Sequence, residues 1–119
     1  MANYSIVSTD GVTTIRFFKE PGFDDICSAI DDIVENYLSD LRLWLFSCGL
    51  NFTNIQIKQL AEYAKSKFLI PSKSAIVAPK DLDFGLARVH DVYREDGFVE
   101  QMVFRTEQKA RVWLKSPIK

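Results

Sequence analysis

The sequence predicts a single α/β domain in which an opening β-hairpin is followed by strands that alternate with helices. The chain has 119 residues, which fits one domain. Hydrophobic residues make up 47% of it, enough to build a core. Short apolar runs of strand length alternate along it with segments of helical period. Because no repeat, low-complexity stretch or internal linker interrupts this pattern, we expect one domain over residues 1–119.

Residues 4–8 and 12–18 are predicted strands joined at Asp10-Gly11. This dipeptide favours a hairpin turn, because glycine accepts a positive φ. The second run reads Val-Thr-Thr-Ile-Arg-Phe-Phe, almost entirely β-branched or aromatic. Glu20-Pro21-Gly22 then ends the hairpin.

A first amphipathic helix is predicted after this break. Asp24 and Asp25 suit the positive end of the helix dipole. The remaining acidic residues fall largely between the apolar ones and indicate a solvated face. The apolar residues that recur at intervals of three and four are Ile26, Ile30, Ile33, Val34 and Tyr37.

Two short apolar runs, residues 41–46 and 74–78, are typical of strands covered on both faces. A helix between them begins at Thr53 or Asn54. Its apolar positions fit the helical period and are Ile57, Leu60, Ala61, Ala64 and Phe68. Pro71-Ser72-Lys73 closes this unit.

The last part of the chain repeats the alternation. Asp81 starts a predicted helix that extends to Tyr93, residues 98–104 form the last strand, and Thr106 caps a final helix. The predicted order is β-β-α-β-α-β-α-β-α. Because each connection between the later strands is a helix, we expect a mixed sheet with parallel central strands and packed helices.

Composition excludes several classes of protein. The formal charge of −1 argues against a nucleic-acid binder, which normally carries a concentrated basic surface. No apolar run approaches the ~20 residues that a transmembrane helix needs, and the N-terminus lacks a signal sequence. Two cysteines cannot form a disulfide framework. We therefore expect a cytoplasmic protein.

The element order and several local phrases resemble the STAS-like domains, relatives of bacterial anti-sigma-factor antagonists. Within that superfamily the chain is similar to the stand-alone branch described as stage-II-sporulation-AA-like or STAS/SEC14-like. The phrases that carry the resemblance are Ala75-Ile76-Val77, Phe84-Gly85-Leu86-Ala87-Arg88, Val103-Phe104-Arg105-Thr106-Glu107, Ala110 and Trp113-Leu114. The resemblance implies a non-enzymatic regulatory module that binds another protein or its own copy. It also implies a binding surface over residues 47–58, to which we assign Cys48, Gly49, Asn51, Phe52 and Asn54.

Phosphorylatable STAS domains carry an Asp-Ser-Ser-Gly-type loop at the start of the helix after the central strand. Residues 49–54 here read Gly-Leu-Asn-Phe-Thr-Asn and lack that motif. Thr53 is the nearest candidate phospho-acceptor and Ser47 a more distant one. A helix N-terminus stabilises a phosphate. The alternative, which we favour, is that Thr53 is an ordinary N-cap.

A second functional hypothesis is a binder or sensor of a small apolar ligand or lipid. The SEC14-like label of the resemblance and the aromatic residues beside predicted loops suggest it. The same aromatic residues also suit a helix-covered core, which we favour, or a dimer interface. They are Phe17, Phe18, Phe23, Trp44, Phe52 and Phe84.

An enzyme ranks last among the hypotheses. His90 borders the inward stripe of its predicted helix, and neither of its neighbours Asp91 and Arg94 forms a catalytic dyad with it. Cys27 and Cys48 are more typical of small buried residues than of nucleophiles. One histidine and two distant cysteines offer no metal-site spacing, and no cofactor motif is present.

The basic last helix complements its own dipole, with weak peripheral membrane contact as the alternative.

Overall fold

The opening hairpin joins β1 (Tyr4–Thr9) to β2 (Val12–Phe17) in a computed structural model of the protein. The structure describes residues 3–37, 40–46, 52–69, 71–80, 85 and 99–116. Asp10 has φ 54° and Gly11 has φ 78°. Two successive positive φ angles give a turn whose twist matches that of the two strands, and Asp-Gly favours this conformation. The predicted hairpin is confirmed.

The five strands form one mixed sheet in the order β1-β2-β3-β4-β5. β1 pairs with β2 antiparallel. The strands that follow β2 in the sheet are all parallel to it and are β3 (Leu41–Leu45), β4 (Ser72–Val77) and β5 (Val99–Phe104). α1 (Phe23–Asn36) and α2 (Asn54–Lys67) provide the crossovers from β2 to β3 and from β3 to β4. The predicted α/β fold with parallel central strands is therefore confirmed.

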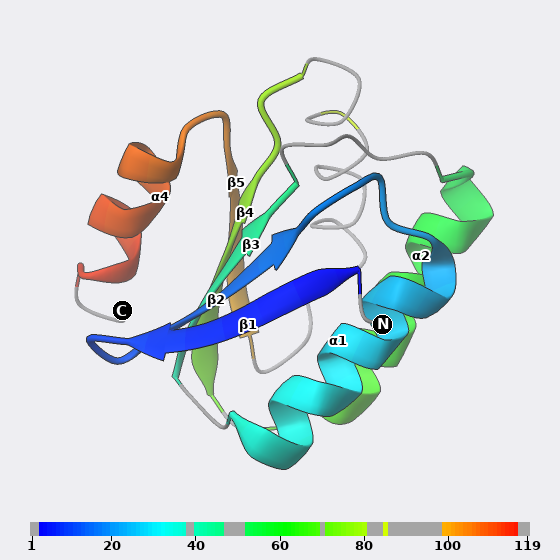
Figure 1. Ribbon diagram of the computed structural model, residues 1–119, viewed down its shortest axis with the longest axis horizontal. Coiled ribbons are helices and arrows are strands. Elements are labelled where there is room, and N and C mark those ends of the chain that lie inside the picture. The colour runs from blue at the N-terminus through cyan, green and yellow to red at the C-terminus, as the bar shows by residue number, and fades with distance from the viewer. Residues whose placement is uncertain are drawn as a thin grey trace.

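The helices lie on both faces of the sheet (Figure 1). Successive right-handed crossovers that proceed across a sheet in one direction place their helices on the same face. α1 and α2 accordingly lie side by side on one face. α4 (Glu107–Leu114) follows the last strand and packs on β3, β4 and β5 from the other face. Of the helix predicted to begin at Asp81, the described residues include only Gly85, which is helical.

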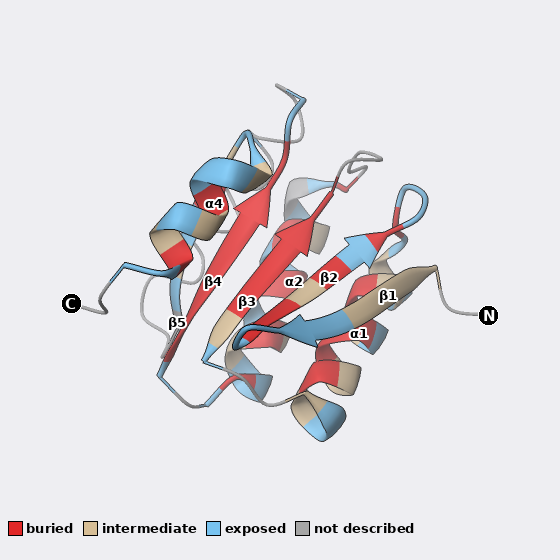
Figure 2. Cartoon of the chain, turned by 60° about the vertical axis from the view of Figure 1, so that its left-hand side comes forward, coloured by how far each residue is buried: buried red, intermediate tan, exposed pale blue. Residues whose placement is uncertain are grey.

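Each face of the sheet has its own apolar core, because side chains alternate along a strand. β3 and β4 are buried along most of their length, whereas the end of β1 is exposed (Figure 2). The core under α1 and α2 includes Ile15, Phe17, Ile33, Trp44, Leu60 and Ile76. The core under α4 consists of Val12, Leu43, Leu45, Ala75, Val77, Ala110 and Leu114.

β4 begins two residues earlier than predicted, at Ser72. Ser72 and Lys73, predicted to lie in a closing turn, are both buried strand residues. Lys73 N–H donates to the Asp40 carbonyl at 2.7 Å. The Lys73 ammonium reaches the C-terminal end of α4, which accepts its hydrogen bonds. A partner distant in sequence therefore makes this charged residue compatible with a central strand.

Among the described residues, every helix is too short or too polar to cross a bilayer.

Candidate functional site

A cavity lies between the sheet and the two helices on its α1–α2 face. About 60 Å³ of it is open to the centre of a water-sized sphere. One water needs roughly 10–15 Å³ on this measure, so the cavity has room for about four to six water-sized groups. The described residues that line it are Ile26, Ile30, Arg42, Trp44, Phe46, Phe52, Ile57, Leu60, Ala64, Phe68, Ser74, Ile76 and Gln101.

The helical wall follows from the period of α2. Ile57, Leu60 and Ala64 are three and four residues apart, so they occupy one stripe of the helix and point at the sheet. All three are buried. Ile26 and Ile30, one turn apart on α1, form the adjoining wall. Regular elements thus form these walls of the cavity.

Stacked aromatic rings adjoin the sheet wall of the cavity. The Phe17 and Phe46 rings have centroids 5.1 Å apart and planes inclined by 11°. The Trp44 and Phe46 rings have centroids 6.3 Å apart and planes inclined by 5°. Such offset stacks stabilise a fixed arrangement of rings. Trp44 and Phe46 therefore present a rigid apolar surface to the cavity.

A polar row crosses the sheet at one end of the cavity. Arg42 on β3 pairs in register with Ser74 on β4, and Ser74 pairs with Gln101 on β5. All three side chains line the cavity. The next paired residues on the same face, Trp44 and Ile76, are apolar. The three polar residues therefore lie at the N-terminal side of the parallel strands, but the surface of the cavity is almost entirely apolar.

Arg42 is a buried charged residue, 3% exposed. Its Nη2 donates a hydrogen bond to Ser72 Oγ at 2.8 Å. Its guanidinium carbon lies 3.9 Å from the centroid of the Phe68 ring, a cation–π contact. These two contacts orient the guanidinium at the cavity wall.

Ser74 is 4% exposed and lines the cavity. Thr13 extends the polar row to β2, where it pairs with Arg42. The Thr13 Oγ1 is buried without a partner in the described part of the chain, but Thr13 does not line the cavity. Buried hydroxyls normally find a partner.

Only part of the predicted binding surface falls within the described residues. Ser47, Cys48, Gly49 and Asn51 lie outside them, as does His90. Phe52 is buried and forms part of the cavity wall.

Thr53 and Asn54 mark the start of α2. Asn54 is the first helical residue. Thr53 is exposed and is the N-cap: its Oγ1 accepts from Gln56 N–H at 3.2 Å, and Gln56 Oε1 accepts from Thr53 N–H at 3.0 Å. The reciprocal pair is a capping box, so the N-cap interpretation of Thr53 is confirmed.

Cys27 is a free, partly buried thiol on α1. Burial raises its pKa, and the nearby carboxylates of Asp24 and Asp31 raise it further. These surroundings favour the protonated thiol rather than the thiolate that a nucleophile requires.

The polar residues of the cavity were missed by sequence analysis. Arg42 and Ser74 occur inside runs interpreted as apolar strands. The sequence signal that could have revealed them is the two-residue period of a strand. Arg42 lies between Leu41 and Leu43 and two residues before Trp44, so Arg42 and Trp44 share a face of the sheet. Recognising the row also requires the register of three strands, which the sequence does not contain.

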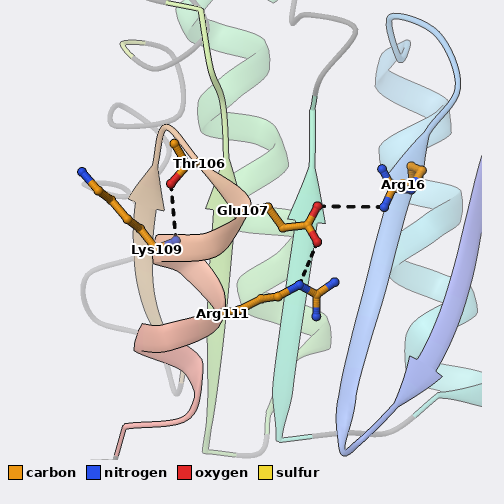
Figure 3. Close-up of polar contacts among 5 residues, drawn as sticks. All are labelled: Arg16, Thr106, Glu107, Lys109 and Arg111. Carbon is orange, nitrogen blue, oxygen red and sulfur yellow. Dashed lines mark hydrogen bonds and ion pairs between the residues drawn. The ribbon is translucent and has the colours of Figure 1, made fainter.

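A groove lies on the other face, between α4 and the uncovered part of β1 and β2. It measures about 340 Å³ on the same scale, and its lining includes Arg16, Arg111 and Lys115. Glu107 lies between two of these cations, 4.0 Å from Arg16 Nη2 and 2.7 Å from Arg111 Nε (Figure 3). Exposed ion pairs of this kind contribute little to stability or recognition. The groove is a solvated, charge-paired surface, so the apolar cavity on the other face is the better candidate site.

The described residues include no group of three or more His, Cys, Asp or Glu side chains that could hold a metal ion. Comparison with protein-family models, with curated proteins and with solved structures gave no significant match.

Proposed function

We propose that this protein is a non-enzymatic binding protein that holds a small apolar ligand in the cavity between its sheet, α1 and α2. The observation that supports this function is a predominantly apolar cavity that the protein's own side chains leave unfilled. Protein interiors are normally packed at the density of organic crystals, so voids larger than a water molecule are few. Apolar cavities stay dry and accept apolar guests of matching size.

The fold supports the same proposal. Phe52 precedes α2 and lines the cavity, at the C-terminal side of the strands. Ligands in open α/β sheets commonly bind on this side. The ligand class proposed from the geometry is therefore small and mainly hydrocarbon.

The test is binding of small apolar probes, such as toluene and 1-hexanol, followed by calorimetry and by the melting temperature. A ligand present at 100 times its Kd stabilises the native state by about 2.7 kcal/mol. Ala64→Leu should abolish binding, because the larger side chain fills the cavity that Ala64 lines. Glu62→Leu is the matched control, since Glu62 is exposed on the same helix. Absence of binding to every apolar probe would contradict the proposal.

A second candidate function is a protein-interaction module of the STAS-like kind, and the surface at the start of α2 favours it. Thr53 is exposed there, and Ile55, two residues later, is 72% exposed. A phosphate on Thr53 would add negative charge beside an apolar side chain, which suits a switchable contact. We propose a second copy or another protein as the partner of this surface.

Intact mass measurement of the protein from its native cell tests this second function. Added mass that survives denaturation and is lost in Thr53→Ala would support a covalent switch. Association that persists in the wild type and is lost in Ile55→Glu would support the contact surface. An unmodified monomer in both experiments would count against the module and leave the cavity proposal standing.

A further inference from the structure

β1 forms a border of the sheet, and this border carries none of the features that normally prevent the pairing of a further strand. β1 is first in the strand order, so among the described strands only β2 pairs with it (Figure 2). Its sequence, Tyr-Ser-Ile-Val-Ser-Thr, contains no charged residue and no proline. Its register with β2 runs from Tyr4 opposite Phe17 to Thr9 opposite Val12 without a bulge. Because charges, prolines and bulges are what usually block an exposed edge, the edge of β1 is open to an added strand.

The backbone of β1 directs hydrogen-bonding groups outward along this edge. Phe18 N–H donates to the Asn3 carbonyl at 2.9 Å, so the backbone of Asn3 bonds toward β2. Hydrogen-bonded and non-bonded pairs alternate along an antiparallel ladder. The residues whose backbone groups face outward are therefore the even-numbered ones, Tyr4, Ile6 and Ser8. Each has one N–H and one C=O with which an added strand can pair.

α1 makes one side of this edge acidic. The side chains of Tyr4 and Ile6 point to this side, where they pack against the core under α1 and α2. α1 contains five carboxylates and no lysine or arginine. Asp25 accepts a hydrogen bond from Asn3 Nδ2 at 3.1 Å, and Asp32 accepts one from the Tyr4 hydroxyl at 3.1 Å, so both carboxylates lie on the flank of α1 beside β1. A strand added to β1 would therefore place every second side chain near negative charge.

The opposite side of the edge is apolar and basic. Val7 points to this side and is 54% exposed. Glu107 on α4 offsets part of the positive charge there. Basic side chains of an added strand are disfavoured on this side, whereas an apolar side chain can cover Val7. The described charged residues that line the groove on this side are three cations and one carboxylate: Arg16, Arg111, Lys115 and Asp10.

We infer that the edge of β1 binds an extended segment of another protein in which basic side chains alternate with apolar ones. The segment extends the sheet by one strand. Its basic side chains lie beside Asp25 and Asp32, and its apolar side chains cover Val7. This binding does not depend on the cavity or on its ligand.

A second copy of the chain fits this edge less well. Two β1 strands that pair antiparallel are related by a two-fold axis perpendicular to the sheet. Both α1 helices then lie on the same side of the joined sheet and face each other across the new pair of strands. Because Asp25 and Asp32 lie on the β1 flank of each helix, like charges would meet there. Charge complementarity therefore favours a basic segment over self-pairing.

A synthetic peptide with the sequence Lys-Val-Lys-Val-Lys-Val-Lys tests this inference. Its binding to the full-length protein is measured by calorimetry at low ionic strength. Two control peptides have the same length: Glu-Val-Glu-Val-Glu-Val-Glu reverses the charge, and Lys-Lys-Lys-Lys-Val-Val-Val keeps the composition without the alternation. We expect both controls to bind at least tenfold more weakly. Equal binding of the two lysine peptides would overturn the inference, because positive charge alone would then be sufficient.

Backbone methylation of the alternating peptide separates strand addition from attraction by charge. Antiparallel pairing is the more stable kind, and residues opposite one another in it share a face and exchange hydrogen bonds. The lysines then lie opposite Tyr4, Ile6 and Ser8 and direct their N–H groups at β1. N-methylation of the lysine amides should abolish binding, and N-methylation of the valine amides should preserve it. Peptides that respond alike to the two modifications would overturn the inference.

Two pairs of variants test the protein side of the contact. Ser8→Pro removes an outward N–H, and proline is tolerated on the free side of an edge strand. It should weaken binding of the alternating lysine peptide at least tenfold, whereas Ser8→Ala keeps the N–H and should bind as the wild type does. Asp32→Asn should weaken binding several-fold, and Glu62→Gln, at an exposed position of α2, should not. Unchanged binding in both Ser8→Pro and Asp32→Asn would overturn the inference.

Hydrogen exchange tests the same contact in the wild type, so the inference stays testable if Ser8→Pro does not fold. In the free protein, the outward N–H groups of Ile6 and Ser8 should exchange faster than those of Ser5 and Val7, which face β2. Saturation with the alternating lysine peptide should slow exchange at Ile6 and Ser8 at least tenfold. Protection confined to other elements would overturn the inference. Protection of Ile6 and Ser8 that rises with protein concentration in the absence of peptide would also overturn it, because a second copy would then occupy the edge.

Discussion

The hydroxyl of Tyr63 on α2 donates a hydrogen bond to Asp31 Oδ1 on α1, with 2.5 Å between the two oxygens. The adjacent residue, Asp32, accepts a hydrogen bond at 3.1 Å from the Tyr4 hydroxyl on β1. Two consecutive carboxylates of α1 therefore hold two different elements. Because the cavity lies between α1 and α2, the Tyr63–Asp31 bond also fixes the distance between two of its walls. Asp31 and Asp32, predicted to lie on a solvated helix face, thus also join α1 to neighbouring elements.

Both tyrosines should titrate late in the native protein. The hydrogen bond to Asp31 raises the pKa of Tyr63 from 10.0 to about 12, with contributions from burial and from the charge of Asp31. Burial and the bond to Asp32 raise the pKa of Tyr4 to about 12 as well. Because the native pKa lies above the unfolded one, their stabilising contribution is complete below pH ~10. We expect it to be lost as the pH rises from about 10 to about 12.

Phenolate absorbance during an alkaline titration measures this shift directly. Tyr63→Phe and Tyr4→Phe should each remove one late-titrating group and should reduce the loss of stability between pH ~10 and ~12. Native tyrosines that all titrate together at the unfolded pKa would contradict this prediction.

Lys73 is a buried cation that stabilises the end of α4. Its Nζ lies 2.5 Å from the Trp113 carbonyl oxygen, 3.0 Å from the Ser116 carbonyl oxygen and 2.9 Å from Ser116 Oγ. It also lies 4.2 Å from the centroid of the Trp113 ring. Carbonyl groups at a helix C-terminus lack intrahelical partners and carry negative partial charge, so a cation is favourable there.

Lys73→Met should destabilise the protein by about 2–3 kcal/mol, because it removes charge-assisted hydrogen bonds while keeping similar bulk. The midpoint of urea unfolding measures the effect. Lys115→Met is the matched control: Lys115 is exposed at the same helix end, and its replacement should change stability by less than about 0.5 kcal/mol. Equal effects of the two substitutions would show that burial of Lys73 does not matter.

Thr53→Ala should destabilise α2 by about 1 kcal/mol, because the Gln56 amide loses its capping oxygen. Thr53→Asp retains a capping oxygen and should remain close to the wild type in denaturant unfolding. A loss of stability in Thr53→Asp equal to that in Thr53→Ala would contradict the capping role. Asp also places a negative charge at this position, so the pair separates capping from any effect of charge on a partner.

The order of strands and helices could be predicted because it depends on local signals. Asp10-Gly11 predicts the hairpin turn, and Thr53 predicts the start of α2. The buried charges could not be predicted in the same way. Lys73 is compatible with a central strand only because Trp113 and Ser116, at least 40 residues later, accept its hydrogen bonds. Likewise, Arg42 interrupts an apolar run, and its contacts with the packed Phe68 and Ser72 help to explain how the core contains it.

The cavity was beyond sequence analysis for a further reason. It is the space that several elements leave between them, so no segment carries a signal for it. Phe52, assigned from sequence to a binding surface, lies in its wall, but the polar row depends on the register of β3, β4 and β5. Alternation predicts which residues of one strand share a face. It does not predict which residues of neighbouring strands lie opposite one another.

The two cores should respond differently to the loss of a leucine. Leu60 lines the cavity from α2, and Leu114 is buried on the opposite face under α4. Leu60→Ala and Leu114→Ala should each destabilise the protein by about 2–5 kcal/mol, since both remove buried methyl groups. Only Leu60→Ala should enlarge the cavity, so only this variant should recover stability when a larger apolar probe such as naphthalene is added. Melting temperatures with and without the probe measure the recovery. If the probe stabilises both variants equally, it binds to any packing defect, and the cavity is no more receptive than the rest of the core.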